Sequence, residues 1–149
     1  MGELQGEGRR KTVNLAVHFS SASEHWATPK AVYAALDAEF HFDYDPCPLH
    51  SEADGLQVNW GGHRVFCNPP YGPAIRKFLD KAAEAQIAVF LIPARTDTRW
   101  FHEIVLPFAS EIRFIKGRLK FGDAKNSAPF PSMIVIFGVS QTDHTLSSD

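Results

Sequence analysis

RVFCNPPYGPAIRKFLDKA, residues 64–82, holds a strand, a rigid turn and a helix in direct succession. The apolar run 65–67 is typical of a strand, and it stops at the tetrapeptide Asn-Pro-Pro-Tyr, residues 68–71. Two consecutive prolines remove two backbone donors and fix φ at both positions, so the strand cannot continue. After the turn, apolar side chains at i, i+3, i+4 and i+7 predict an amphipathic helix, with Ile75, Phe78, Leu79 and Ala82 on one face.

Upstream of this stretch, the pattern predicts a further helix and a short strand. Pro29 can be the first helical residue, and apolar side chains at helical spacing continue to Phe40. Residues 40–44 then alternate between apolar and polar, as in a short strand that the following prolines interrupt. Residues 49–63 contain three glycines and are predicted to form a loop.

Downstream, the apolar run QIAVFLIPA (86–94) is typical of a buried strand that is covered on both faces. Thr96 or Asp97 can cap the next helix, and Pro107 would help to end it. Two strands follow, Ile112–Ile115, with an extension through Leu119–Phe121, and Met133–Phe137.

Strands that alternate with helices across short connections predict an α/β fold with a mostly parallel sheet and helices on both faces. The last two strands are joined by a loop without a helix, which predicts an antiparallel C-terminal hairpin at one edge. Ligands of such sheets bind at the carboxyl ends of the strands. The segments DYDPCP (43–48) and NPPY (68–71) both follow predicted strands, so we expect them to face one cleft.

The composition is that of one soluble globular domain. The chain has 149 residues, of which 44% are hydrophobic and 21% charged. We expect a flexible arm over residues 1–20, a single domain over 21–140 and a disordered tail over 141–149. No run is long enough to span a membrane, and two cysteines are too few for a disulfide framework, so a cytoplasmic location is expected.

A net charge of −2 argues against a protein that coats nucleic acid, but the positive charges are unevenly placed. One group lies between the last two strands and consists of Arg113, Lys116, Arg118, Lys120 and Lys125. These side chains could neutralise DNA phosphates beside the cleft, or they could be solvated charges on an edge hairpin. The alternation in residues 118–121 predicts that one face is buried and the other carries the charge.

The Asn-Pro-Pro-Tyr turn suits one particular chemical problem. An exocyclic amine of a nucleobase is planar and a poor nucleophile, because its lone pair is delocalised into the ring. Two acceptors aimed at its hydrogens favour the pyramidal form that attacks. The Asn68 oxygen and a rigid backbone carbonyl, that of Pro69, can supply them, while Tyr71 offers a ring on which a flipped-out base stacks. The alternative is a proline-rich turn in which Asn68 caps the helix.

Seven ordered blocks resemble the small phage-type DNA N6-adenine methyltransferases, which depend on S-adenosylmethionine. The blocks are WATP (26–29), FDYDPCP (42–48), DGLQVNW (54–60), FCNPPYG (66–72), LIPARTDTRWFHE (91–103), IKGRLKF (115–121) and PFPSMIVIF (129–137). The resemblance implies a Rossmann-like methyltransferase sheet and methyl transfer to adenine N6 of a flipped-out base in double-stranded DNA.

The resemblance also implies roles for particular residues. The catalytic motif is the turn Asn68, Pro69, Pro70 and Tyr71. The first cofactor motif is taken by Asp45, Pro46 and Cys47, and Thr28 with Pro29 matches the segment that closes over the methionine end of S-adenosylmethionine. Asp54 and Asp43 are the candidates for the cofactor ribose. Only 22 residues separate Asp45 from Asn68, so a reduced sheet is expected.

Arg95 and Arg99 follow the central apolar strand, and we expect at least one of them to contact DNA near the flipped base. The alternatives are an ion pair between Arg95 and Asp97, and a surface charge at Arg99. No segment is large enough for a separate recognition domain, so specificity is low, very short, or completed by a second subunit in a homodimer.

Other functions remain open from sequence alone. RNA-guanine and protein-glutamine methyltransferases also use Asn-Pro-Pro-Tyr turns, and a non-catalytic DNA-binding module is a third class. Cys47, His50, His63 and Cys67 have a spacing that resembles a zinc site, which would stabilise such a module. Because Cys67 lies in an apolar strand, where a small buried residue is ordinary, we predict no metal.

Overall fold

The protein, described here from a computed structural model covering residues 26–48, 54–123 and 125–138, is built around a four-stranded mixed sheet. The strands are β2 (Arg64–Cys67), β3 (Ile87–Pro93), β4 (Glu111–Phe114) and β5 (Ser132–Phe137), in the order β2-β3-β5-β4. β2 and β3 are parallel, whereas β5 is antiparallel to both of its neighbours. The α/β class and the antiparallel C-terminal pair are confirmed, but only one adjacent pair is parallel.

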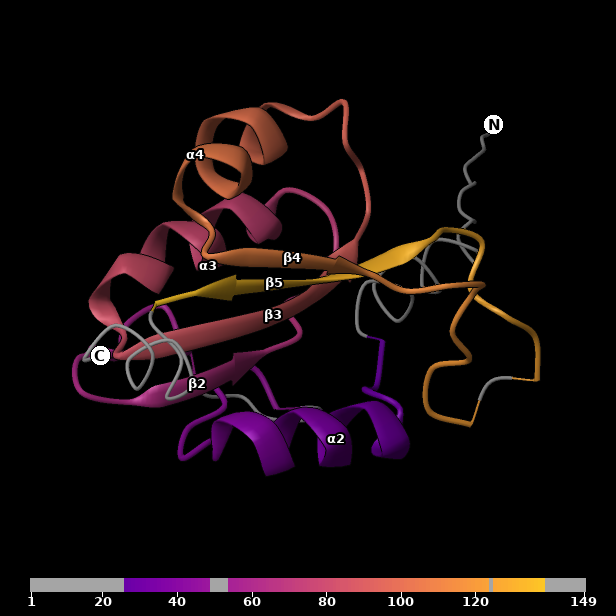
Figure 1. Ribbon diagram of the computed structural model, residues 1–149, viewed down its shortest axis with the longest axis horizontal. Helices are drawn as coiled ribbons and strands as arrows, with labels where there is room; N and C mark the ends of the chain where they lie inside the picture. The colour runs from indigo at the N-terminus through magenta and orange to yellow at the C-terminus, as the bar shows by residue number, and fades with distance from the viewer. Residues whose placement is uncertain (1–25, 49–53, 124, 139–149) are drawn as a thin grey trace, which may run out of the picture.

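Helices lie on both sides of the sheet. Helix α2 (Lys30–Phe40) lies on one side, and α3 (Ala74–Lys81) and α4 (Leu106–Phe108) lie on the other (Figure 1). Every residue of β3 and of β5 is buried, as expected for strands covered on both faces. The amphipathic helix after the turn is also confirmed, because the four predicted residues Ile75, Phe78, Leu79 and Ala82 are all buried.

The predicted strand over residues 40–44 is wrong. Phe40 is the last residue of α2, and His41 takes a left-handed conformation with φ 54° that ends the helix. Only Tyr44 forms a bridge, parallel to Val65 of β2. The apolar alternation has a different cause here, because Phe42 packs against Phe66 with ring centroids 5.3 Å apart.

The helix after β3 begins later than predicted and contains a wide turn. Its cap is Thr98, not Thr96 or Asp97, because the Thr98 Oγ1 accepts the Phe101 N–H at 3.2 Å. The π-helical turn η2 (Phe101–Val105) follows, in which the Leu106 N–H bonds back to the Phe101 carbonyl. Pro107 has no N–H to donate, and its ring crowds the preceding turn. This accounts for the wider hydrogen-bonded turn of η2 and for the end of α4 at Phe108.

The extension of the fourth strand through residues 119–121 is also wrong, because β4 ends at Phe114. Gly117 takes φ 77°, which turns the chain out of the sheet. The segment folds back on itself instead, with the Ala128 N–H donating to the Leu119 carbonyl at 2.7 Å. The residues expected to form a flexible arm and a tail lie largely outside the described ranges. None of the helices in those ranges has the length and apolarity that crossing a membrane requires.

Candidate active site

The predicted site residues gather at the end of the sheet where β2, β3 and β4 finish. In Figure 1 this is the right-hand end, where the start of α2 and the connection from β4 to β5 also lie. The connection is fastened to this end by two backbone hydrogen bonds, from Ala94 to the Pro131 carbonyl and from Gly122 to the Ala27 carbonyl, both 2.9 Å. Residues 43–48 and 68–71 both lie at this end of the sheet, but the cavity found there is lined by Asp45 and Pro48 and by no residue of 68–71, so that the two segments face one cleft stays a prediction.

Asn68 directly follows β2, and its amide is held by a segment some 40 positions upstream. Its Nδ2 donates to the Trp26 carbonyl and to the Thr28 Oγ1, the latter at 3.0 Å. Its Oδ1 is buried and has no hydrogen-bond partner among the described residues. A buried acceptor without a donor is unusual in folded proteins, so this oxygen is the first place to look for a ligand.

Tyr71 is buried within an aromatic cluster of Trp26, Tyr71, Phe121 and Phe130. Its hydroxyl donates to the Leu91 carbonyl at 3.2 Å, and burial raises the pKa of the phenol well above its ordinary value. The Trp26 ring is stacked on it, with centroids 6.5 Å apart and planes inclined by 23°. Trp26 is therefore a near-parallel neighbour of the ring on which we expect a base to stack, and the sequence analysis missed its part in the site. Pro69 is buried and Pro70 half-buried.

A cavity of about 420 Å³ lies beside this turn, between α2 and β2. Thr28 and Asp45 both line it, together with Ala27, Lys30, Tyr33, Pro48 and Phe66. Pro29, which the resemblance placed with Thr28, immediately precedes α2. The structure thus brings the two predicted cofactor segments to one cavity. A second cavity, of about 400 Å³, lies at the opposite end of the sheet and contains none of the predicted site residues.

Asp45 carries the carboxylate of this cavity. One of its oxygens accepts the Cys47 N–H at 2.9 Å, which closes the turn around Pro46. Burial raises the pKa of the Asp45 carboxyl, and the hydrogen bond from Cys47 opposes that shift only in part. Pro46 is buried under Gly55, where any side chain at Gly55 would collide with the Pro46 ring and carbonyl.

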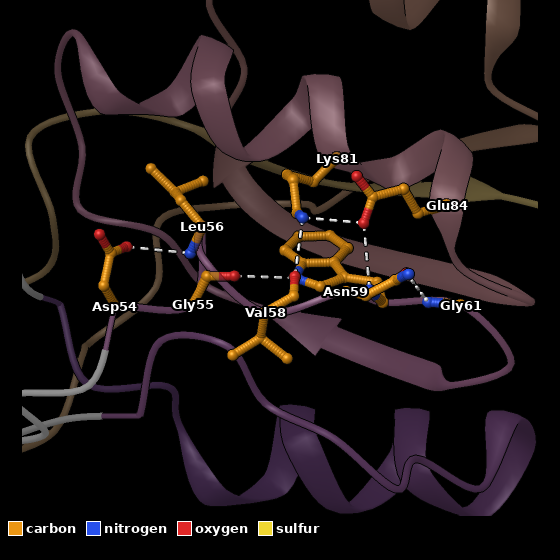
Figure 2. A network of polar contacts seen from close by, with 9 residues as sticks. Asp54, Gly55, Leu56, Val58, Asn59, Gly61, Lys81 and Glu84 are labelled. Atoms are coloured by element: carbon orange, nitrogen blue, oxygen red, sulfur yellow. Dashed lines mark hydrogen bonds and ion pairs between the residues drawn. The ribbon is translucent and has the colours of Figure 1, made fainter.

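The two candidates for the cofactor ribose already have partners in the protein. Asp54 accepts the Leu56 N–H at 2.9 Å and forms the first turn of the 54–61 loop (Figure 2). Asp43 accepts the Arg64 N–H and lies 3.0 Å from the His63 Nδ1. Neither carboxylate lines the cavity that holds Thr28 and Asp45.

Sequence analysis missed a network of polar contacts around the buried Trp60, in which Gly55, Val58, Lys81 and Glu84 take part (these four are labelled in Figure 2). The indole N–H donates to the Gly55 carbonyl at 3.0 Å, and the Trp60 backbone N–H donates to Glu84 at 3.1 Å. Lys81 joins the network through the Val58 carbonyl at 2.7 Å and through Glu84 at 2.8 Å. The block DGLQVNW therefore holds the fold together. The stretch from Gly55 to Trp60 has no pattern typical of a helix or a strand, so this role could not be predicted from the sequence.

The two arginines after β3 differ in their surroundings. Arg95 is exposed, and its guanidinium lies 5.9 Å from the Phe130 ring at the edge of the aromatic cluster. No ion pair joins it to Asp97 in the described part of the chain. Arg99 lies exposed on the helix surface and pairs with Glu103 at 3.1 Å, and Glu103 also binds Arg76. Contact of Arg99 with DNA stays a prediction.

The basic group predicted between the last two strands also divides, because Arg113 lies within β4 and the other members follow it. Arg113 is paired with Glu39 and Glu111, both at 2.7 Å, and hydrogen bonds from Arg113 lower the pKa of the Glu39 carboxyl. The other four side chains are exposed, and no ion pair links them to another described residue: Lys116, Arg118, Lys120 and Lys125. Leu119 and Phe121 point inward, so the predicted division into an apolar and a basic face is confirmed.

The proposed zinc ligands are not assembled by the residues that can be described. Over 26–48, 54–123 and 125–138, no group of three or more His, Cys, Asp and Glu side chains is placed to hold a metal ion. Burial raises the pKa of Cys47 to about 11 and also raises that of Cys67. His50 lies outside the described residues, so the zinc alternative stays a prediction.

Comparison with known proteins agrees with the geometry. Residues 18–148 match the family model described as DNA N-6-adenine-methyltransferase (Dam). No curated protein and no solved structure matches the chain. The match spans nearly all of the sequence, including every block that carries a predicted site residue.

Proposed function

The chain belongs to the DNA N-6-adenine-methyltransferase family and is an adenine-N6 DNA methyltransferase, and from this premise we propose how its residues carry out the reaction. The methyl donor is S-adenosylmethionine and the acceptor is the N6 amine of an adenine flipped out of double-stranded DNA. The single observation that carries the proposal is the buried Oδ1 of Asn68 at the carboxyl end of β2, which has no hydrogen-bond partner in the part of the chain that the structure describes.

Asn68 acts on the amine. Its Oδ1 accepts one N6 hydrogen, and the Pro69 carbonyl accepts the other, so the nitrogen becomes pyramidal and its lone pair is free to attack. The hydrogen bonds from N6 to these two acceptors strengthen as positive charge develops on the nitrogen. They therefore stabilise the transition state more than the ground state. The N–C bond would form as the bond between the methyl carbon and the sulfonium sulfur breaks, with the electron pair left on sulfur, and the methylated amine would then release one N6 proton to water.

The cavity lined by Thr28 and Asp45 suits the methyl donor. Its volume of about 420 Å³ lies within the usual range for small-molecule sites. When bound, S-adenosylmethionine supplies a methyl group on a sulfonium. The Asp45 carboxylate can attract the cationic groups of this molecule, and a cation beside Asp45 would reverse the rise in its pKa. Tyr33 and Phe66 supply apolar walls.

The sheet is consistent with a reduced Rossmann-like methyltransferase fold. Tyr44, β2 and β3 are parallel neighbours, and β4 runs in the same direction because it is antiparallel to β5. Only β5 is reversed. The donor cavity and the Asn68 turn lie at the carboxyl ends of the parallel strands, where ligands of open α/β sheets bind.

DNA is expected to lie over the aromatic cluster and the exposed basic side chains. Arg95 lies at the edge of that cluster, whereas Arg99 is already neutralised by Glu103. A base that stacks on Tyr71 would lie next to the Trp26 ring, which is only half-buried. The paired Arg113 takes no part in this surface, which is made by Lys116, Arg118, Lys120 and Lys125.

The test is methyl transfer by the purified full chain with S-adenosylmethionine and double-stranded DNA, measured as N6-methyladenine by mass spectrometry. Asn68→Ala should lower the rate by roughly 10²–10³-fold, equivalent to about 3–4 kcal/mol of transition-state stabilisation. Calorimetric titration should show nearly unchanged binding of S-adenosylmethionine.

Gln57→Ala is the matched control, because it removes an exposed amide from the 54–61 loop. A parent protein that methylates RNA or a protein amide but not adenine in DNA would contradict the proposed function. A near-normal rate for Asn68→Ala would leave the family assignment intact but remove Asn68 from the mechanism.

A further inference from the structure

The Asn68 side chain has two N–H donors and one acceptor oxygen, and within residues 26–48, 54–123 and 125–138 only the donors have partners. Nδ2 donates to the Trp26 carbonyl and to the Thr28 Oγ1 at 3.0 Å. A backbone carbonyl can only accept, so the nitrogen and not the oxygen must face Trp26. The orientation of the amide therefore follows from the chemistry of its neighbours.

This orientation decides where Oδ1 lies. If the amide turned by 180°, its oxygen would face the Trp26 carbonyl oxygen, two acceptors in contact with no proton between them. In the observed orientation Oδ1 instead points away from residues 26–28 and has no partner among the described residues. The two donors thus hold the acceptor ready for an incoming hydrogen.

The segment that accepts from Asn68 is itself anchored. The Trp26 ring packs edge-on against Phe121 and Phe130, with centroids 5.4 and 5.3 Å apart. The Ala27 carbonyl accepts the Gly122 N–H at 2.9 Å. On the other side, Pro29 has φ −60° and leads directly into α2. Residues 26–28 are therefore held between the helix and the 115–131 connection.

We propose that Thr28 is a positioning residue for methyl transfer, which with the Trp26 carbonyl takes both amide protons of Asn68 and so aims its oxygen at the adenine N6 hydrogen. This role rests on the proposed function and adds to it, because Thr28 acts through Asn68 and not only through the donor cavity that it lines. Without the Thr28 hydroxyl, one Nδ2 hydrogen loses its acceptor and the amide can rotate about its side-chain bonds.

Thr28→Val tests this, because valine keeps the shape of threonine and loses the hydroxyl, whereas Thr28→Ser keeps the hydroxyl. At saturating DNA and S-adenosylmethionine, Thr28→Val should lower kcat roughly tenfold, the effect of one hydrogen bond. The Kd for S-adenosylmethionine and the KM for DNA should stay within about twofold. Thr28→Ser should keep kcat within about twofold of the parent.

A double-mutant cycle measured in kcat distinguishes positioning of Asn68 from a purely structural role of Thr28. In the Asn68→Ala background, Thr28→Val should have no further effect on kcat, because the group that it positions is gone. The same cycle in thermal unfolding should also be non-additive, and this measurement needs no activity. Equal loss in both backgrounds, in kcat or in stability, would overturn the proposal.

Two other results would also overturn it. A parent-like kcat for Thr28→Val would show that the hydroxyl is not needed. A raised Kd for S-adenosylmethionine with unchanged kcat would make Thr28 a donor contact only. These failures differ from failure of the proposed function, in which the parent chain itself would not form N6-methyladenine.

Discussion

Two polar groups that flank β2, the N–H groups of Trp60 and the side-chain amide of Asn68, differ in what is left unpaired. Just before the strand, Trp60 is buried and both its indole and its backbone N–H groups have acceptors, in the network of Figure 2. Just after the strand, Asn68 uses both of its donors, but its buried oxygen has no donor among the described residues. Seven residues separate the paired N–H groups of Trp60 from the incompletely paired amide of Asn68.

The difference separates stability from chemistry. A buried polar group that is paired stabilises the fold modestly, whereas an unpaired one costs about 1–3 kcal/mol. A buried polar group without a partner calls for an explanation, and at Asn68 we propose that the substrate amine supplies the partner. The Trp60 end should therefore tolerate substitution in the catalytic assay but not in unfolding, and the Asn68 end should behave in the opposite way.

Trp60→Ala is expected to have the largest effect and tests the comparison directly. Removing a buried indole should lower the free energy of unfolding by about 3–5 kcal/mol. The Trp60 ring packs against Phe78 and Phe90, so the cavity left behind is in the core. The measurement is urea unfolding, with methyl transfer normalised to folded protein. Trp60→Phe, which keeps an aromatic ring, should lose less stability.

The comparison would break if Trp60→Ala lowered kcat of the folded fraction as strongly as Asn68→Ala does. In that case the Trp60 network would act on the site as well as on the fold.

A smaller effect is expected from reversing charge beside the Asn68 end. Converting Lys116, Lys120 and Lys125 together to Glu should weaken DNA binding roughly 10- to 100-fold, similarly for all sequences, and reduce the salt slope by about 2–3. These side chains are exposed and no described residue pairs with them, so folding should be unaffected. Fluorescence anisotropy over a range of salt concentrations measures both quantities.

Arg113→Ala provides the matched control for this charge reversal. Arg113 lies in the same stretch but is held by Glu39 and Glu111, so its loss should change the salt slope little. If the triple variant methylates DNA like its parent at physiological salt, the connection between β4 and β5 does not contact DNA.

The smallest effect is a change in pH dependence at Asp45. Burial raises the pKa of this carboxyl in the folded state. The protonated form is therefore favoured by folding, so the stabilisation is fully present below the unfolded pKa of about 3.9 and is lost as pH rises through the folded pKa. Asp45→Asn should remove this pH-dependent loss of stability. Its free energy of unfolding at neutral pH should therefore exceed that of the parent, by at most about 1 kcal/mol because the carboxyl is partly exposed.

Unfolding of both proteins from pH 4 to pH 8 checks the sign, because the difference in stability should grow with pH. Calorimetry should show that Asp45→Asn binds S-adenosylmethionine more weakly, since the amide lacks the charge that attracts a cation. A constant stability difference across the range, with unchanged binding, would return Asp45 to an ordinary turn residue.

Sequence patterns predicted those parts of the fold whose burial is periodic. The run 86–94 became the fully buried β3, and the helical spacing after the turn became α3. The failures came where apolar spacing had another origin. Phe40, Phe42 and Tyr44 alternate because a helix ends and a ring packs on β2, and Leu119 and Phe121 face inward without any strand ladder. The position of the helix cap at Thr98 was missed because neighbouring residues could also have served.

The order of the blocks and the Asn-Pro-Pro-Tyr turn predicted an adenine-N6 DNA methyltransferase, which the family match bears out, and they singled out Asn68 as the candidate catalytic residue. Only the tertiary structure decided that Trp26 and Thr28 hold its amide, that the Trp26 ring lies nearly parallel to that of Tyr71, and that Arg113 is paired with a residue 74 positions away. The reason is physical. Local patterns report which residues are buried, but a hydrogen bond or an ion pair forms over a few ångströms between atoms that packing brings together. Which segment lies against the turn depends on how α2 and the connection from β4 to β5 pack around the sheet.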